Sequence, residues 1–182
     1  MYNVCMLQRK EQIITDRLVL KTIEEKDKKD LLEIVENPLV KKSYMLPDLT
    51  NEEEEERFFQ RLKDFTLKTD KFVYGIYLNN KIIGYINQVS LEEEVIELGY
   101  FIDPKEWNKG YATEALKAAI NELFRMGLKA VQAAHFEMNL ASGRVMQKAG
   151  MHSIDKTEIV EYRNAEHRCL YYEIENKKII VY

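Results

Sequence analysis

A strand, a short polar loop and a helix follow one another near the middle of the chain, and this run constrains the fold more than any other stretch. Residues 95–102 (VIELGYFI) are rich in β-branched and aromatic side chains, which is typical of a strand. Apolar residues then recur at helical spacing over residues 112–124, and Gly127 follows where helix C-termini favour glycine. The loop before this helix contains Gly110, so free backbone N–H groups and the positive helix end point at one place. The sequence therefore predicts an anion site, such as one for a pyrophosphate.

The nucleotide-binding motifs that share this layout are absent. No GxxxxGK[ST] pattern is present, and the loop lacks the three glycines of a dinucleotide fingerprint. The loop is therefore either a different kind of phosphate site or an ordinary strand–loop–helix connection that binds nothing.

Length, charge and cysteine content exclude several classes of protein. A chain of 182 residues is long enough for one domain and short for two. The formal net charge of −4 disfavours nonspecific nucleic-acid binding, and no apolar run approaches a bilayer span or a signal-peptide core. Cys5 and Cys169 form neither a metal-like spacing nor a framework of bridges. We expect a cytoplasmic protein with reduced thiols, without a metal, and without nucleic-acid or membrane partners.

The chain reads as one domain, residues 1–182, with a core over about residues 13–174. Strands are predicted over residues 13–21, 72–78, 81–90, 95–102, 131–136, 154–162 and 169–174. Capping boxes at Thr22/Glu25 and Thr50/Glu53 predict two helices before residue 68, and a looser acidic connection is expected at residues 92–94. The helix after Gly110 implies a crossover, so strand 131–136 should lie parallel to strand 95–102.

Two stretches, in this order, resemble motifs A and B of the Gcn5-related N-acetyltransferases (GNAT). Motif A is usually [Q/R]-x-x-G-x-[G/A]; Gly110 and Ala112 fill its small positions, and Trp107 stands where Gln or Arg is usual. The run WNKGYATEA is similar to the variant in the RimJ/RimL-like branch, which acetylates ribosomal-protein N-termini. Residues 139–151 (NLASGRVMQKAGM) resemble motif B. Cys169 stands where family members often carry Asp, and Asn164-Ala165 where they carry Asn-Gly.

This resemblance implies the fold and the activity. The fold would be α/β (α+β), a mixed, mostly antiparallel sheet of six to seven strands flanked by about four helices, with parallel strands splayed at the cofactor site. The activity would be transfer of an acetyl group from acetyl-CoA to a primary amine, a protein N-terminus or a small molecule, by direct attack in a ternary complex. Such an enzyme would be a monomer or a homodimer and would need no metal.

The resemblance also implies which residues hold the cofactor. The pantetheine arm would lie along the strand before the loop, and backbone N–H groups of the loop would hold the two phosphates, with added charge from Lys109. Two motif-B side chains would complete the site. The cofactor-binding residues expected in this way are Tyr100, Phe101, Ile102, Trp107, Asn108, Lys109, Gly110, Tyr111, Ala112, Thr113, Asn139 and Ser142.

Catalysis requires removal of a proton from the amine and stabilisation of the leaving thiolate. Glu161 matches the base proposed in the ribosomal-protein branch, and Glu97 matches the strand glutamate of many relatives; either could instead simply face solvent. Met146 occupies the position of the family's usual acidic tyrosine, so Ser142 is the expected group at the thiolate, unless it only satisfies its helix N-terminus. His135, His152 and His167 show no ligand spacing, so we expect structural or surface roles for them rather than catalysis or metal binding.

A function of another class is a non-catalytic acyl-CoA-binding sensor or assembly module. Met146 and the choice between two bases motivate this alternative, and thiol release from acetyl-CoA in the presence of amines separates it from an enzyme. The acceptor site is expected between the first helices and the final hairpin, with the acceptor itself left open.

Overall fold

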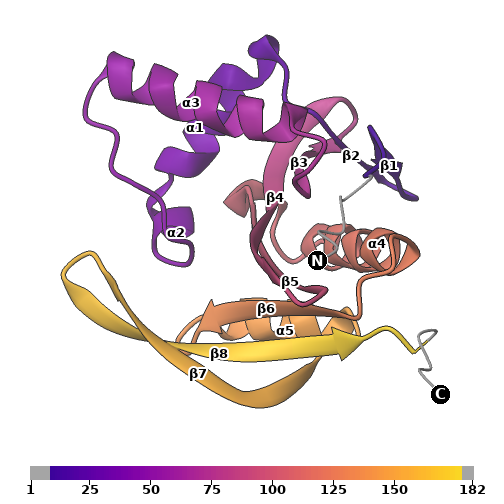
Figure 1. Cartoon of the computed structure of the whole chain (residues 1–182). Coiled ribbons are helices and arrows are strands. Elements are labelled where there is room, and N and C mark those ends of the chain that lie inside the picture. Colours follow the sequence, from indigo (N-terminus) through magenta and orange to yellow (C-terminus); the bar gives the residue numbers. More distant parts are fainter. Residues whose placement is uncertain (1–8, 178–182) are drawn as a thin grey trace.

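A single mixed sheet forms the centre of the computed structural model, which describes residues 9–177 (Figure 1). In that range the sheet has eight strands in the order β1-β2-β3-β4-β5-β6-β8-β7. The strands are β1 (Ile13–Ile14), β2 (Leu18–Lys21), β3 (Val73–Leu78), β4 (Lys81–Glu92), β5 (Val95–Ile102), β6 (Ala130–Phe136), β7 (His152–Tyr162) and β8 (Ala165–Glu175). Neighbouring strands are antiparallel except β5 and β6, which confirms the mixed, mostly antiparallel sheet and its parallel pair.

Helices cover both faces of this sheet. They are α1 (Lys28–Glu36), α2 (Pro38–Lys41), α3 (Glu52–Leu67), α4 (Tyr111–Arg125) and α5 (Leu140–Lys148), with short 3₁₀ turns η1 (Glu25–Asp27) and η2 (Pro104–Glu106). One buried cluster joins α4 and α5 to the sheet, and a second joins α1, α2 and α3 to its other face. Strand alternation makes both clusters possible: on β5, Leu98 packs with the first cluster and Phe101 with the second.

The extra strand arises where an expected continuous strand is broken. Residues 13–21 form β1 and β2, which fold back on each other as an antiparallel pair, with Ile13 opposite Leu20. The polar turn between them is held by Thr15, whose hydroxyl oxygen accepts from the amide of Leu18 at 2.9 Å. This turn reaches α4 and becomes important at the site below.

Both expected capping boxes lie away from their predicted positions. At η1 the box joins Glu24 and Asp27. The Asp27 carboxylate accepts from the amide of Glu24 at 2.8 Å, and it also accepts from the Tyr77 hydroxyl. At α3 the cap is Asn51, whose side chain accepts from the amide of Glu54 at 3.0 Å. In each case a better-placed oxygen acceptor outcompetes the predicted threonine.

Two connections are tighter than the sequence suggests. The expected loose acidic connection after β4 is a two-residue turn, with Glu93 and Glu94 at φ 49° and 70°. The final hairpin turns in the same way at Arg163 and Asn164, with φ of 54° and 58°. Both turns have the left-handed backbone of type I′ hairpins without glycine, so pairing of the long flanking strands stabilises them.

The remaining general expectations divide by region. Cys169 is a buried free thiol in β8, whereas Cys5 and most of the N-terminal lead-in lie outside the described residues. In the described part of the chain, no helix is long and apolar enough to cross a membrane. Among the same residues, no three His, Cys, Asp or Glu side chains gather as a metal site requires.

Candidate active site

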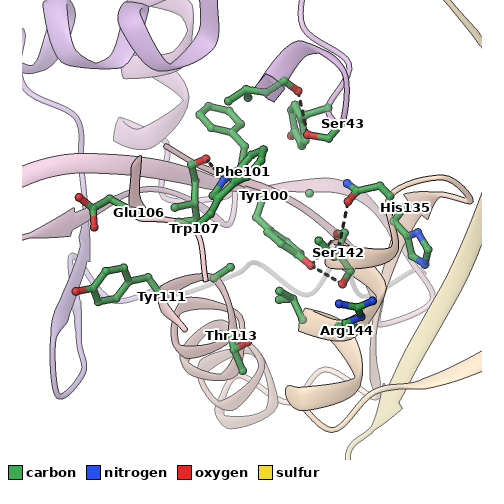
Figure 2. Close-up of a pocket in the computed structure, with 18 of the residues that line it drawn as sticks. Ser43, Tyr100, Phe101, Glu106, Trp107, Tyr111, Thr113, His135, Ser142 and Arg144 are labelled. Carbon is green, nitrogen blue, oxygen red and sulfur yellow. Dashed lines mark hydrogen bonds between the residues drawn. The ribbon is translucent and has the colours of Figure 1, made fainter. Parts of the chain in front are cut away.

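A cavity opens where the two parallel strands separate. β5 and β6 are paired only from Val95↔Ala130 to Leu98↔Ala133; beyond Leu98, β5 continues beside β4, and β6 continues beside β8. The cavity between them has a volume of about 330 Å³, and its walls come from β5, the following loop, and the first turns of α4 and α5 (Figure 2). The predicted site residues that line it are Tyr100, Phe101, Ile102, Trp107, Asn108, Gly110, Tyr111, Ala112, Thr113, Asn139 and Ser142.

The loop after β5 presents a row of free backbone N–H groups. Asn108 and Gly110 have φ of 62° and 84°, and α4 begins directly after Gly110. The amides of residues 108–113 donate no hydrogen bond to any residue in the range 9–177, and the first intrahelical bond runs from the amide of Glu114 to the carbonyl of Gly110. Successive free amides at the positive end of a 15-residue helix form an anion site with the geometry expected for phosphate oxygens.

Trp107 fixes the position of this loop relative to the strand. Its indole Nε1 donates to the carbonyl of Ile102 at 2.7 Å, and its side chain is 40% exposed at the cavity wall. A tryptophan is suited to this position because its long, rigid ring carries a donor at its edge. The bond ties the loop back to the last residue of β5.

Lys109, expected to add positive charge beside the phosphates, has a protein partner in this structure. Its ammonium group pairs with the Glu106 carboxylate at 2.9 Å, and its side chain does not line the cavity. The pair is exposed, so it is weak and can exchange partners. Lys109 as a phosphate ligand stays a prediction.

The turn between β1 and β2 supports the loop at residues 108–113 from outside, through a set of bonds that we call the brace and that the sequence did not suggest. The Arg17 guanidinium bonds the Glu114 carboxylate through Nε at 2.6 Å and donates through Nη1 to the carbonyl of Lys109 at 3.0 Å. The Thr15 hydroxyl donates to the same carboxylate at 2.6 Å. Partial burial alone would raise the pKa of Glu114, but bonds from Thr15 and Arg17 outweigh burial and lower it. The only available signal was the polar Thr15-Asp16-Arg17 run inside an otherwise apolar strand.

Two hydroxyl groups meet across the cavity. The Tyr100 hydroxyl on β5 lies 3.0 Å from Ser142 Oγ in the first turn of α5, and Figure 2 shows the two side chains pointing toward each other. Asn139 caps α5 by accepting from the Ser142 amide at 3.2 Å, and it also lines the cavity. Burial raises the pKa of Tyr100, so the phenol stays protonated.

The two candidate bases are placed differently. Glu97 is half-buried on β5, on the same strand face as Gly99, which lines the cavity roughly 7 Å farther along. Burial, with the nearby Glu158 carboxylate, raises the pKa of Glu97 despite the opposing charge of Lys156. Glu161 is exposed on β7, opposite Glu166, and does not line the cavity. Glu97 does not line the cavity either, so neither assignment is tested by these positions.

Tyr44 also lines the cavity, although the sequence did not single it out. Tyr44, which follows α2, donates to Asn87 Oδ1 at 2.6 Å and packs edge-on against Phe101, with ring centroids 5.2 Å apart. His135 is buried in the cavity wall, and its Nδ1 lies 2.7 Å from the Phe136 carbonyl, whereas its Nε2 has no hydrogen-bond partner among the described residues. Loop residues such as Tyr44 carry no periodic pattern that would identify them.

The tip of the final hairpin is attached to this same region. The Tyr162 hydroxyl donates to the carbonyl of Lys41 at 2.9 Å and accepts from the amide of Leu46 at 3.3 Å. Arg163, beside it, pairs with Asp48 at 2.5 Å. The segment after α2 and the β7–β8 hairpin therefore form one connected wall, in the region where the acceptor site was expected.

Comparisons with known proteins agree with this geometry. A family model described as an acetyltransferase (GNAT) domain matches residues 17–152. The uncharacterized N-acetyltransferase YnaD of Bacillus subtilis (strain 168) is 31% identical over 141 residues, covering 76% of this chain and 81% of that protein. The crystal structure of a GNAT-family acetyltransferase from Bacillus anthracis aligns with a TM-score of 0.77 at 26% identity, covering 91% of this chain and 99% of that one.

The fold is also similar to that of RimL, a ribosomal L7/L12 alpha-N-protein acetyltransferase solved in complex with coenzyme A. The TM-score is 0.79 over 91% of this chain and 98% of RimL, at 20% identity. At this identity the likeness concerns the fold alone.

Proposed function

This chain belongs to the GNAT family of acyl-CoA-dependent acetyltransferases, with acetyl-CoA as co-substrate, and from that premise we propose that it acetylates a primary amine by direct attack in a ternary complex. The family membership favours an enzyme over a non-catalytic sensor. The acceptor class we propose is an amine nitrogen, either a protein N-terminus or a small molecule.

The observation that carries the proposal is the joining of one cavity to one row of free amides. The cavity lies between separated strands, where the unpaired edge of β5 at residues 100–102 can bond an extended amide-containing arm. The row of amides at residues 108–113 begins at the end of the same strand. A ligand with an extended amide arm followed by a diphosphate, such as acetyl-CoA, fits both parts at once.

The residues of the cavity can then take three roles. A backbone N–H at the end of β5 would polarise the thioester carbonyl, and one such donor typically contributes about 3–4 kcal/mol to lowering the barrier. Glu97, directly or through water, would accept the amine proton, with Glu161 as the alternative base. Ser142 would donate a hydrogen bond to the leaving sulfur.

Two measurements test this proposal. Titration calorimetry with acetyl-CoA should show saturable binding, and thiol release should appear with at least one member of a panel of small amines and N-terminal peptides. Binding without turnover on any amine would reject the acetyl-transfer proposal, and no binding would reject the cofactor site as well.

A further inference from the structure

The hydroxyl groups of Tyr100 and Ser142 are within hydrogen-bond distance of each other in the cavity wall. Ser142 is held in the first turn of α5 by the bond from its amide to Asn139 Oδ1, so the backbone that carries its Oγ is fixed in position. The Tyr100 hydroxyl reaches this Oγ at 3.0 Å, and it also lies 3.4 Å from the Ser142 carbonyl oxygen. Within residues 9–177 no other hydrogen-bond partner is found for the Tyr100 hydroxyl.

The direction of the bond follows from the acidity of the two groups. A phenol is a stronger acid than an aliphatic alcohol, so the phenol is the better donor in such a pair. The Ser142 carbonyl oxygen competes for the single phenol hydrogen, but it lies at 3.4 Å, whereas Oγ is the nearer acceptor at 3.0 Å. With Tyr100 as donor, the hydroxyl hydrogen of Ser142 is left free to point into the cavity.

We propose that Tyr100 is a positioning residue for Ser142, donating to its Oγ so that the Ser142 hydroxyl hydrogen is directed at the sulfur of coenzyme A. This inference rests on the proposed function. Met146, one turn farther along α5, is 1% exposed and carries no proton to offer, whereas the Tyr100 phenol on the opposite wall lies within hydrogen-bond distance of Ser142 Oγ. Donation from Tyr100 polarises Ser142 and makes it a stronger donor in turn.

The chemistry balances without any further reactant. The amine nitrogen forms a bond to the acetyl carbon, the carbon–sulfur bond breaks, and its electron pair stays on sulfur as a thiolate. Ser142 stabilises this thiolate by a hydrogen bond and keeps its own proton, as Tyr100 does. The amine gives up one proton to the base, and the thiolate takes one from solvent on release.

The acidity of the bound thiol tests the pair without needing the acceptor. The probe is coenzyme A itself, titrated in complex with each variant while the ultraviolet absorbance of the thiolate is followed. Tyr100→Phe removes only the hydroxyl and should weaken the acid dissociation of the bound thiol by about fivefold, the effect of one neutral hydrogen bond. Ser142→Ala should weaken it at least as much, and adding Tyr100→Phe to Ser142→Ala should change nothing more.

Tyr172→Phe is the matched control. Its hydroxyl also bonds α5, accepting from Gln147 at 3.3 Å, but it does not line the cavity. This variant should leave the acid dissociation of the bound thiol the same as in the unmodified protein. On any acceptor that is turned over, Tyr100→Phe should lower kcat about fivefold with KM for acetyl-CoA unchanged.

Each outcome decides one proposal. Equal effects of Tyr100→Phe with and without Ser142, or no effect on the bound thiol, would overturn the positioning role while leaving acetyl transfer intact. A coupled effect on the thiol without turnover of any amine would support the pair and reject the proposed reaction. Failure of coenzyme A to bind the unmodified protein would overturn both.

Discussion

Gly110 holds a backbone conformation, φ 84°, that side chains rarely adopt, at the point where the phosphate loop becomes a helix. An added Cβ would lie 3.4 Å from Arg17 Nη2, an ordinary contact, so space alone does not demand glycine. Gly110→Asp should therefore fold, but it places a carboxylate against the expected phosphates. Gly110→Asn is the matched control, because asparagine has the same shape and also tolerates the left-handed region.

We expect the aspartate variant to bind acetyl-CoA at least about tenfold more weakly than the asparagine variant, as two like charges in partial contact imply. Calorimetry measures the affinities, and thermal unfolding confirms that both variants fold. Equal affinities in the two variants would remove the loop from the cofactor site.

Glu97 permits a prediction about pH at the same scale. A base works only when deprotonated, so the rate should rise with pH as Glu97 loses its proton. Burial and the Glu158 carboxylate raise the pKa of Glu97, so this rise should lie above the usual glutamate range. Glu97→Gln should remove the rise and lower kcat by about 100-fold.

Glu161→Gln is the comparison for that experiment, because Glu161 is exposed whereas Glu97 is half-buried, and both lie outside the cavity lining. A pH profile and kcat for both variants decide between the two bases. If Glu161→Gln alone loses activity, the base lies on the hairpin and Glu97 is only a buried strand residue.

At the scale of elements, the β1–β2 turn and the start of α4 act as one unit through Arg17. Arg17→Met keeps much of the side-chain length but loses the bonds to Glu114 and to the Lys109 carbonyl. Since the Arg17 side chain is 46% exposed, the loss of folding stability should be no more than about 1 kcal/mol. The affinity for acetyl-CoA should still fall several-fold, because the loop must then be ordered on binding.

Arg57→Met is the control for this effect, since Arg57 makes an exposed ion pair with Glu53 on α3, far along the chain from the loop. Denaturant unfolding and calorimetry separate the two quantities. Parallel losses of affinity in both variants, or none in Arg17→Met, would show that the brace does not support the loop.

Elements also show where sequence reasoning succeeds and where it stops. The parallel crossover from β5 through α4 to β6 was predictable because a strand, a loop and a helix of clear periodicity follow one another directly along the chain, and a crossover helix joins parallel strands. The turn at Glu93–Glu94 was not, because two glutamates with positive φ are stabilised only by the pairing of the strands beside them. The brace by Arg17 joins positions 97 residues apart, and no local pattern encodes such a contact.

Most of the residues expected to hold the cofactor follow from such local patterns, whereas the wall formed by the segment after α2 and the final hairpin depends on long-range contacts. Motif residues such as Gly110 and Ser142 line the cavity because one loop and one helix start place them there. Tyr44 and Tyr162 are defined by long-range contacts between the α2 region and the final hairpin. This difference explains why the sequence pointed to acetyl-CoA but not to the acceptor.

At the scale of the whole molecule, Tyr162 joins the final hairpin to the segment that follows α2. In Figure 1 the β7–β8 hairpin extends beneath α2, and the Tyr162 hydroxyl bonds the backbone of the segment from Lys41 to Leu46 there. Lys41 and Leu46 are themselves 8% and 5% exposed, so the junction is shielded from solvent. The wall formed by the segment after α2 and the β7–β8 hairpin therefore depends on a contact between residues more than a hundred positions apart.

Tyr162→Phe should loosen this wall and leave the cofactor loop unchanged. The buried carbonyl and amide that lose their partner should cost about 1 kcal/mol of folding stability. Because the hairpin and the α2 segment would move independently, KM for the acceptor should rise while affinity for acetyl-CoA stays constant. Tyr172→Phe, on the same hairpin but bonded to α5, should change neither quantity. Steady-state kinetics with the acceptor varied, beside calorimetry with acetyl-CoA, give the comparison. A loss of cofactor affinity in Tyr162→Phe would mean that the two halves of the site are coupled through the sheet, because the Tyr162 hydroxyl itself bonds the segment from Lys41 to Leu46 and not the loop at residues 108–113.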